Sequence, residues 1–252
     1  MLQVNDIHVS FGALHVLRGI SFGASAGEIL GIIGPNGAGK STLFSAITGF
    51  HRPRQGSVLL DGENLKRLRP DQVAGKGLVR TFQVPREFGH MTVLENLMVA
   101  GSSRAADTIT TGLFGGRKLA ESEGRLKERA LAMLERLNLM HVASNPAKAL
   151  SGGQKKLLEL GRTLMVEPKV LLVDEPFAGV APALRDLLVG HLRALRDEGL
   201  CLLIVEHDIE AIMQLSDRIC VLVDGVILID GTPAEVQADR RVLDAYLGAV
   251  SA

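Results

Sequence analysis

The stretch that most constrains the fold of this 252-residue chain is GPNGAGKST, from Gly34 to Thr42. It follows the short apolar run 28–33 and precedes residues 41–50, whose composition is helical. Its glycines let successive backbone N–H groups curve round a phosphate without Cβ clashes, and a helix start adds partial positive charge. Because the motif stands between a strand and a helix, it predicts a phosphate cradle at the start of an α/β fold.

The positions of this cradle have expected contacts. Lys40 would reach the β- and γ-phosphates of a nucleotide, and Ser41 would offer its hydroxyl to Mg²⁺. Further nucleotide contacts are expected from Asn36, Gly37, Ala38, Gly39 and Thr42. The motif therefore predicts a nucleoside triphosphate bound with Mg²⁺.

A second motif supplies acidic groups. The apolar run Val170–Val173 ends in Asp174 and Glu175. In a parallel sheet this strand end lies at the same edge as the cradle. There Asp174 can hold Mg²⁺ through water, and Glu175 can polarise an attacking water molecule.

Apolar runs and helical stretches alternate in the second half of the chain. One apolar stripe of helical period consists of Leu126, Ala130, Met133, Leu134 and Leu137. A helix from about Gly152 to Val166 should stop before Pro168. Strand-like runs follow at 170–173, 202–205 and 219–223. This order predicts a largely parallel sheet covered by helices on both faces.

Composition restricts the class of protein. Lys plus Arg and Asp plus Glu both number 28, and the resulting net charge of zero argues against a dedicated nucleic-acid binder. Hydrophobic residues make up 46 %, enough for a packed core, but no apolar run approaches the ~18 residues of a membrane span. The N-terminus lacks signal-peptide regions, and Cys201 and Cys220 lie in apolar runs typical of buried, reduced thiols. We therefore expect a soluble intracellular protein.

The pentapeptide Leu150-Ser151-Gly152-Gly153-Gln154 stands between the two nucleotide motifs. Ser151 can cap the following helix, and the amides of Gly152 and Gly153 at its positive end can meet a γ-phosphate held by another subunit. With this pentapeptide the chain resembles the ATP-binding subunit of ABC transporters. The resemblance implies a homodimer, or a heterodimer with a related ATPase, that encloses two ATP molecules head to tail. Ser151, Gly152, Gly153 and Gln154 would then contact the ATP of the opposite subunit.

The same resemblance implies the fold and its division. We expect an α/β P-loop NTPase fold with a mostly parallel core sheet, an antiparallel N-terminal β-subdomain and an inserted helical subdomain. Within this single ABC ATPase domain, the nucleotide-binding core should comprise approximately residues 1–90 and 167–252. The helical signature subdomain should comprise approximately residues 91–166.

Further positions match functional residues of the family. Gln83 matches the glutamine that links metal and water to the membrane partner, so we expect it in both catalysis and metal binding. His207 matches the histidine that contacts the γ-phosphate, Phe11 matches the aromatic that stacks on adenine, and Val16 lies near enough to flank the base. One position departs from the pattern: Ala181 stands where a carboxylate or amide is usual. Alanine cannot make that hydrogen bond between subunits, so coupling of the two ATP sites would be weaker or use backbone contacts.

Three segments narrow the resemblance. They are VRTFQ at 79–83, MTVLENL at 91–97 and DAYLG at 244–248. They look like the branched-chain amino acid uptake group, as does the polar excursion at 101–116. Urea and amide importers share these features, and a lipopolysaccharide export ATPase is a more distant relative.

The expected function is an ATPase that powers an ABC importer for branched-chain amino acids or related small amides. Two membrane-spanning permease subunits and, indirectly, a substrate-binding protein would be its partners, with no role for nucleic acid. The expected location is the cytoplasmic face of the inner membrane, as a peripheral subunit, with residues 84–91 as a docking surface.

Two alternatives stay open on sequence alone: a soluble ABC ATPase of iron–sulphur cluster assembly, and an ABC exporter ATPase. DNA-repair and translation ATPases of the superfamily usually carry a coiled-coil insertion or a second nucleotide domain, and this chain has neither. The sequence does not name the cargo.

Overall fold

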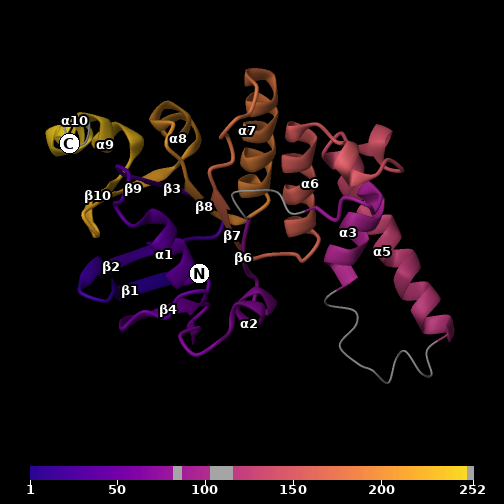
Figure 1. Cartoon of the computed structure of the whole chain (residues 1–252), viewed down its shortest axis with the longest axis horizontal. Coiled ribbons are helices and arrows are strands. Elements are labelled where there is room, and N and C mark those ends of the chain that lie inside the picture. Colours follow the sequence, from indigo (N-terminus) through magenta and orange to yellow (C-terminus); the bar gives the residue numbers. More distant parts are fainter. Residues whose placement is uncertain (82–86, 103–115, 249–252) are drawn as a thin grey trace. The chain divides into compact units, whose positions relative to one another are not determined.

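The computed structural model describes residues 1–81, 87–102 and 116–248. These residues form two compact units (Figure 1). The first unit takes in Met1–Arg80, Lys169–Ala178 and the described part of Val189–Ala252. The second unit takes in Gly179–Leu188 and the described parts of Thr81–Pro168.

An antiparallel sheet occupies the N-terminal part of the first unit. Its order is β2-β1-β4-β5. The strands are β1 (Leu2–Phe11), β2 (Leu14–Ala24), β4 (Gln55–Leu60) and β5 (Glu63–Asn64). Leu2, Val4, Ile7 and Val9 point into the core from β1, and this near-alternating burial is typical of a sheet with one face packed on the protein.

A six-stranded sheet forms the centre of the first unit, in the order β10-β9-β3-β8-β7-β6. The strands are β3 (Ile29–Ile33), β6 (Leu78–Arg80), β7 (Val170–Asp174), β8 (Cys201–Val205), β9 (Arg218–Val223) and β10 (Val226–Gly231). Every pairing is parallel except that of β9 with β10. All residues of β3, β7 and β8 are buried, as continuous apolar runs in a parallel sheet require. The predicted fold class is confirmed.

Helices cover these sheets. They are α1 (Lys40–Ile47), α2 (Pro70–Gly75), α8 (Ile209–Leu215), α9 (Pro233–Ala238), α10 (Arg240–Gly248) and the C-terminal part of α7 (Pro182–Asp197). Phe44 of α1 is fully buried in a core cluster with residues of both sheets, such as Ile7 and Leu203. Cys201 and Cys220 are free and buried, as predicted.

The second unit is helical where it is described. It contains α3 (Val93–Ser102), α5 (Gly116–Arg136), α6 (Gly152–Leu164), the start of α7 and two 3₁₀ turns, Met140–Val142 and Ala147–Ala149. Helices α5 and α6 both pack against α3 (Figure 1). Ala130, Leu134 and Leu137 of the predicted apolar stripe are completely buried, which confirms its helical period.

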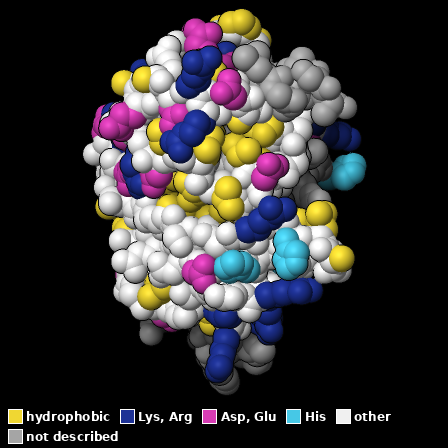
Figure 2. All heavy atoms as spheres, turned by 90° about the vertical axis from the view of Figure 1, so that its left-hand side faces the viewer, with side chains coloured by type: hydrophobic (Ala, Val, Ile, Leu, Met, Phe, Trp, Pro, Cys, Tyr) yellow, Lys and Arg dark blue, Asp and Glu magenta, His cyan; other side chains and the backbone are white. Residues whose placement is uncertain are grey.

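The C-terminal elements of the first unit leave apolar side chains exposed. Val226 is 42 % exposed and Leu243 is 57 % exposed. Figure 2 looks at the side on which β10, α9 and α10 lie, and hydrophobic side chains there lie among acidic and basic ones. In the described ranges no helix is long and apolar enough to cross a membrane.

Two hairpins of the first unit use the same tight turn. Asp61-Gly62 joins β4 to β5, and Asp224-Gly225 joins β9 to β10, with positive φ at both turn residues in each case. This is the type I′ turn, which strongly prefers Asp-Gly. The turns differ in their surroundings: a Cβ on Gly225 would lie 2.2 Å from the carbonyl oxygen of Val16, whereas a Cβ on Gly62 would meet nothing.

We expect Gly225→Ala to destabilise the protein more than Gly62→Ala. Alanine at either site costs about 1–2 kcal/mol because of the left-handed backbone. At Gly225 the methyl group also displaces the β2 backbone at Val16, which adds about 1–3 kcal/mol. Urea unfolding followed by circular dichroism measures both variants, and equal losses would contradict the close approach of these two segments.

Candidate functional site

The register of the central sheet brings three loops to one edge. In β7 and β8, Asp174 pairs with Val205, and in β3 and β8, Ile32 pairs with Val205. The segments that follow these strands therefore begin beside one another at the carboxyl edge of the sheet. Ligands of open α/β sheets bind at this edge.

The first of these segments is the predicted cradle. Gly39, with a φ of +105°, precedes α1, and Asn36 and Gly37 are exposed in the loop. Lys40 is 6 % exposed, and its Nζ donates to the carbonyl oxygens of Gly34 at 2.7 Å and Pro35 at 3.0 Å. These bonds hold the ammonium group within the loop.

The Lys40 ammonium has acidic neighbours. Burial lowers its pKa from the usual value, while the charges of Glu175 and Asp174 act in the opposite direction. The structure thus brings Lys40 together with both predicted acidic residues. Ser41, with an exposed side chain, and Thr42, half-buried, continue α1 from the same point.

The second and third segments meet through Glu175 and His207. Nε2 of His207 lies 2.9 Å from Oε1 of Glu175. Glu175 adopts a φ of +49°, and its N–H donates to the carbonyl oxygen of Val205. A non-glycine residue in this region is strained, and such strain concentrates at functional sites. The predicted base and the predicted γ-phosphate contact are therefore neighbours.

Glu206, between β8 and His207, was not among the predicted site residues. Its side chain is buried and accepts hydrogen bonds from the N–H of Phe177 at 2.6 Å and of His207 at 3.0 Å. Burial raises the pKa of Glu206, and these backbone bonds offset the rise only in part. One carboxylate thus ties the segment after β7 to the segment after β8. The sequence feature that could have indicated Glu206 is the position of a carboxylate directly after a fully apolar strand.

Tyr246 of α10 is a second contact that the sequence analysis did not place at the cradle. Burial raises the pKa of Tyr246 to about 12, and a hydrogen bond with the backbone of Gly34 works against this rise. The C-terminal helix therefore reaches the first glycine of the cradle.

The predicted adenine contacts also belong to the first unit. Phe11, at the end of β1, is 51 % exposed, and its ring centroid lies 4.7 Å from that of His51. Val16 of β2 is half-buried. An exposed aromatic at a strand end offers a face on which a base can stack.

The signature pentapeptide lies at the start of α6 in the second unit. Ser151 is the N-cap: its hydroxyl accepts from the N–H of Gln154, whose side chain accepts from the N–H of Ser151. This capping box confirms the predicted helix start. Gly153 has a packing reason to lack a side chain, because a Cβ would lie 1.9 Å from Leu184 of α7. Gly152 is exposed.

Ala181 and Gln83 are two further positions for which the sequence predicts a role. The carbonyl oxygen of Ala181 accepts hydrogen bonds from the N–H groups of Leu184 and Arg185 at the start of α7. Gln83 lies outside the described residues, as do positions 84–86 of the predicted docking surface and positions 103–115 of the polar excursion.

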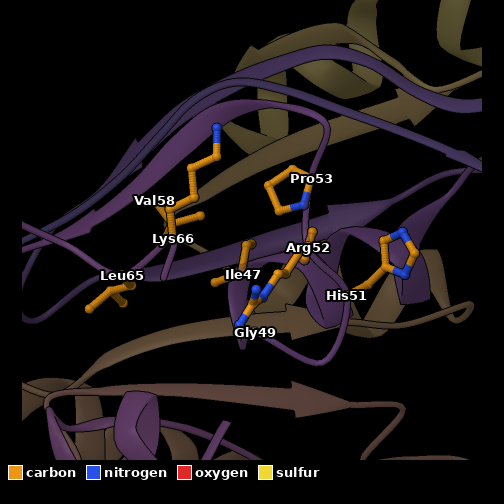
Figure 3. A pocket seen from close by; sticks show the side chains of 9 residues that line it. Ile47, Gly49, His51, Arg52, Pro53, Val58, Leu65 and Lys66 are labelled. Atoms are coloured by element: carbon orange, nitrogen blue, oxygen red, sulfur yellow. The ribbon is translucent and has the colours of Figure 1, made fainter. Parts of the chain in front are cut away.

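A small hollow is lined by residues at and just after the C-terminal end of α1 (Figure 3). Apolar side chains such as Ile47, Val58 and Leu65 line it, and its cavity volume of about 10 Å³ leaves room for about one water molecule. The cationic side chains of Arg52 and Lys66 point in different directions (Figure 3). This hollow is therefore too small for a nucleotide and does not gather its charges on one point.

The donor groups at the sheet edge suit a hard cation. Asp174 supplies a buried carboxylate and Ser41 a hydroxyl, the oxygen ligands that Mg²⁺ prefers. Across the described part of the chain, no three His, Cys, Asp or Glu side chains gather into a metal site of their own. Among the described residues, Asp174 and Ser41 are therefore the two predicted metal ligands at this edge.

Comparison with known proteins decides the family. A family model described as "ABC transporter" matches residues 17–178, and one described as "Branched-chain amino acid ATP-binding cassette transporter" matches residues 228–252. The chain belongs to the ABC transporter family. It is therefore an ATP-hydrolysing, nucleotide-binding subunit of a transporter, as the sequence predicted.

Similar proteins align with nearly the whole of this ABC ATPase. The high-affinity branched-chain amino acid transport ATP-binding protein BraF of Pseudomonas aeruginosa is 39 % identical, with 98 % of each chain covered. LivG of Escherichia coli K12, described in the same words, is 37 % identical over 98 % of each chain. A solved ATP-binding cassette of an ABC transporter in its ADP conformation is 37 % identical with a TM-score of 0.85, again over 98 % of each chain. A nucleotide-free ATP-binding cassette is 36 % identical with a TM-score of 0.84.

The buried Glu206 gives this ATPase a specific pH dependence. Its pKa in the folded protein lies above the unfolded value, so its contribution to stability is complete below pH 4.5 and is lost as pH rises through the raised pKa. The Glu206→Gln variant lacks this titration. We therefore expect the stability of the unchanged protein, relative to this variant, to fall as pH rises above 4.5.

Glu235 provides a control of opposite sign. Hydrogen bonds from the backbone and side chain of Thr232 hold the pKa of this exposed carboxyl below its usual value. Relative to Glu235→Gln, the unchanged protein should therefore lose stability as pH falls below 4.5. Urea unfolding between pH 3 and 8 measures both comparisons, and a pH-independent difference for Glu206→Gln would contradict the raised pKa.

Proposed function

We propose that this ABC ATPase powers an importer for branched-chain amino acids or related small amides. The observation that carries the proposal is the match of residues 228–252 to the branched-chain amino acid transporter model. Full-length similarity to BraF and LivG supports it. The proposal selects import over export and over iron–sulphur cluster assembly.

The cysteines argue against the iron–sulphur alternative. Burial raises the pKa of Cys201 to about 12, and burial likewise raises the pKa of Cys220. Cluster ligation requires thiolates. Two buried, protonated thiols are suited to core packing instead.

The proposed nucleotide site is built from the sheet edge of the first unit. The backbone of residues 36–39 and the side chains of Lys40 and Thr42 bind the phosphates, and Phe11 with Val16 holds the adenine. The proposed ligands of Mg²⁺ are Ser41, Asp174 and Gln83. The ion, when bound, neutralises charge on the phosphates.

The proposed hydrolysis depends on the contact between Glu175 and His207. Glu175 polarises the attacking water and accepts its proton, and His207 contacts the γ-phosphate. The hydrogen bond at 2.9 Å supports this pairing, because it orients the carboxylate before ATP arrives. Glu206 holds the backbone on both sides of the pair.

Two ATPase subunits are proposed to act as a head-to-tail pair. Ser151, Gly152, Gly153 and Gln154 of one subunit would contact the ATP held by Lys40 of the other. The capping box supports this role, because it fixes the N-terminus of α6, whose positive end attracts the γ-phosphate. The pair would be a homodimer or would include a related ATPase.

Membrane-spanning permease subunits are proposed to dock on residues 84–91, which places the ATPase peripherally on the cytoplasmic face of the inner membrane. A substrate-binding protein would act through these permeases. In the described part of that segment, Phe88 is 45 % exposed and Met91 is 39 % exposed. Exposed apolar side chains of this kind support a protein contact.

Uptake tests the transport proposal. Cells that lack their own branched-chain amino acid uptake, and carry this ATPase with the membrane proteins that co-purify with it, should accumulate labelled leucine. The same cells with Glu175→Gln should not. Uptake of urea or acetamide without leucine would assign a different cargo, and no uptake of any of these by an assembled complex would refute the importer.

Lys40→Ala should lower ATP affinity by roughly 10- to 10²-fold, because a charge-assisted phosphate contact of about 1.5–3 kcal/mol is lost. Calorimetric titration with ATP measures this. Lys169→Ala is the matched control, because that exposed lysine pairs with Asp61 at 2.5 Å on another part of the first unit. Unchanged ATP affinity in Lys40→Ala would refute the cradle assignment.

Glu175→Gln should reduce hydrolysis by about 10²–10⁴-fold while ATP binding survives, because the amide has the same shape but accepts no proton. ATP would then be trapped, so this variant should dimerise with ATP and run as a monomer without it. Adding Ser151→Arg should abolish the dimer by filling the opposite γ-phosphate pocket.

Light scattering coupled to size-exclusion chromatography measures the dimer, and phosphate release measures the rate. A Glu175→Gln protein that hydrolyses ATP at the normal rate would contradict the catalytic assignment. A protein that stays monomeric with saturating ATP would contradict the homodimer.

A further inference from the structure

Arg80, the last residue of β6, contacts the candidate site although the sequence analysis gave it no role. Its Nη2 donates to Oδ2 of Asp174 at 2.6 Å, and its Nη1 donates to Oγ of Ser45 at 3.1 Å. The side chain of Asp174 is 5 % exposed and that of Arg80 is 15 % exposed. The ion pair is therefore shielded from water, where fixed charges interact more strongly.

Ser45 extends this contact toward the cradle. Its hydroxyl donates to the carbonyl oxygen of Ser41 at 2.8 Å, one helical turn earlier in α1. A hydroxyl can donate one bond and accept others, so the bonds to Ser41 and from Arg80 coexist. A continuous chain of hydrogen bonds thus runs from Asp174 through Arg80 and Ser45 to Ser41.

Besides its ion pair with Asp174, the guanidinium group of Arg80 contacts a buried aromatic ring. Its Cζ lies 5.5 Å from the centroid of the Phe44 ring, which is completely buried. Its Nε is buried and has no hydrogen-bond partner among the residues that the structure describes. An orphaned N–H is costly, and lysine would carry the same charge without it. What lysine cannot supply is the planar fork that reaches Asp174 and Ser45 together.

We propose that Arg80 is a positioning residue for Mg²⁺: it fixes the Asp174 carboxylate relative to the turn of α1 that carries Ser41. The inference rests on the proposed function, in which these two residues hold the ion. The backbone of Arg80 in β6 pairs with Leu172 of β7, two residues before Asp174.

Arg80→Lys and Arg80→Met test the proposal in the Glu175→Gln background, where ATP is consumed about 10²–10⁴-fold more slowly. Mg²⁺ is titrated calorimetrically into the protein–ATP complex after unbound ATP, which itself binds Mg²⁺, has been removed. Loss of groups that orient metal ligands typically weakens metal binding by about 10–100-fold. We expect a loss of that size in both variants, with ATP affinity in the absence of Mg²⁺ unchanged.

Arg218→Lys is the matched control. Arg218 is also partly buried and bridges two carboxylates, those of Glu28 and Asp230, but Glu28 lies before the amino end of β3, away from the cradle. This variant should melt at a lower temperature and bind Mg²⁺ normally. In the single variant Arg80→Lys, which retains Glu175, excess Mg²⁺ should restore ATP hydrolysis. Excess Mg²⁺ would not restore hydrolysis if the substitution had impaired folding.

Two other results of the Mg²⁺ titrations would contradict the role proposed for Arg80. Unchanged Mg²⁺ affinity in Arg80→Lys overturns the proposal, because charge alone would then suffice. Tighter Mg²⁺ binding in Arg80→Met also overturns it, because Arg80 would then compete with the ion. Asp174→Asn distinguishes failure of the proposed metal site from failure of the role given to Arg80. If Asp174→Asn leaves Mg²⁺ affinity unchanged, the proposed metal site itself is wrong. If Asp174→Asn weakens Mg²⁺ binding while Arg80→Lys does not, only the role of Arg80 is wrong.

Discussion

The parallel pairing of β8 with both β3 and β7 is the constraint on which the rest of the site depends. Val205 faces Ile32 on one side and Asp174 on the other, so three chain segments leave the sheet side by side. A slip of one residue in either pairing would turn every side chain of the shifted strand to the opposite face. Because β3, β7 and β8 are buried on both faces, a slipped strand would have to fit every side chain into a different place in a close-packed core, and this repacking opposes the slip. Hydrophobic packing thus sets the positions of charged groups.

Those charged groups form a balanced set in a site of low dielectric. Lys40, Arg80, Asp174 and Glu206 are all largely buried, and each has partners close by. Paired burial limits the desolvation cost that an isolated charge would carry. It also fixes the directions of the side chains before a nucleotide arrives, which lowers the reorganisation needed during hydrolysis.

The sequence predicted those parts of the site whose signal is local. The glycine spacing of the cradle, the acidic end of β7 and the serine cap of α6 each occupy a few consecutive residues. Arg80 and Glu206 were not predicted, because their roles depend on partners that are distant in the sequence. Arg80 meets Asp174 across 94 positions of the chain, and Glu206 meets Phe177 across 29. Only strand order and register decide those meetings, and hydrophobic patterns specify that strands exist without specifying which strands become neighbours.

The contact between Tyr246 and Gly34 has an optical consequence. The chain contains no tryptophan and only one tyrosine. Its ultraviolet emission above the weak phenylalanine background therefore originates from a single ring, which hydrogen-bonds to the backbone of the cradle's first glycine. Intrinsic fluorescence of the unlabelled protein is in effect a one-site probe of the phosphate loop.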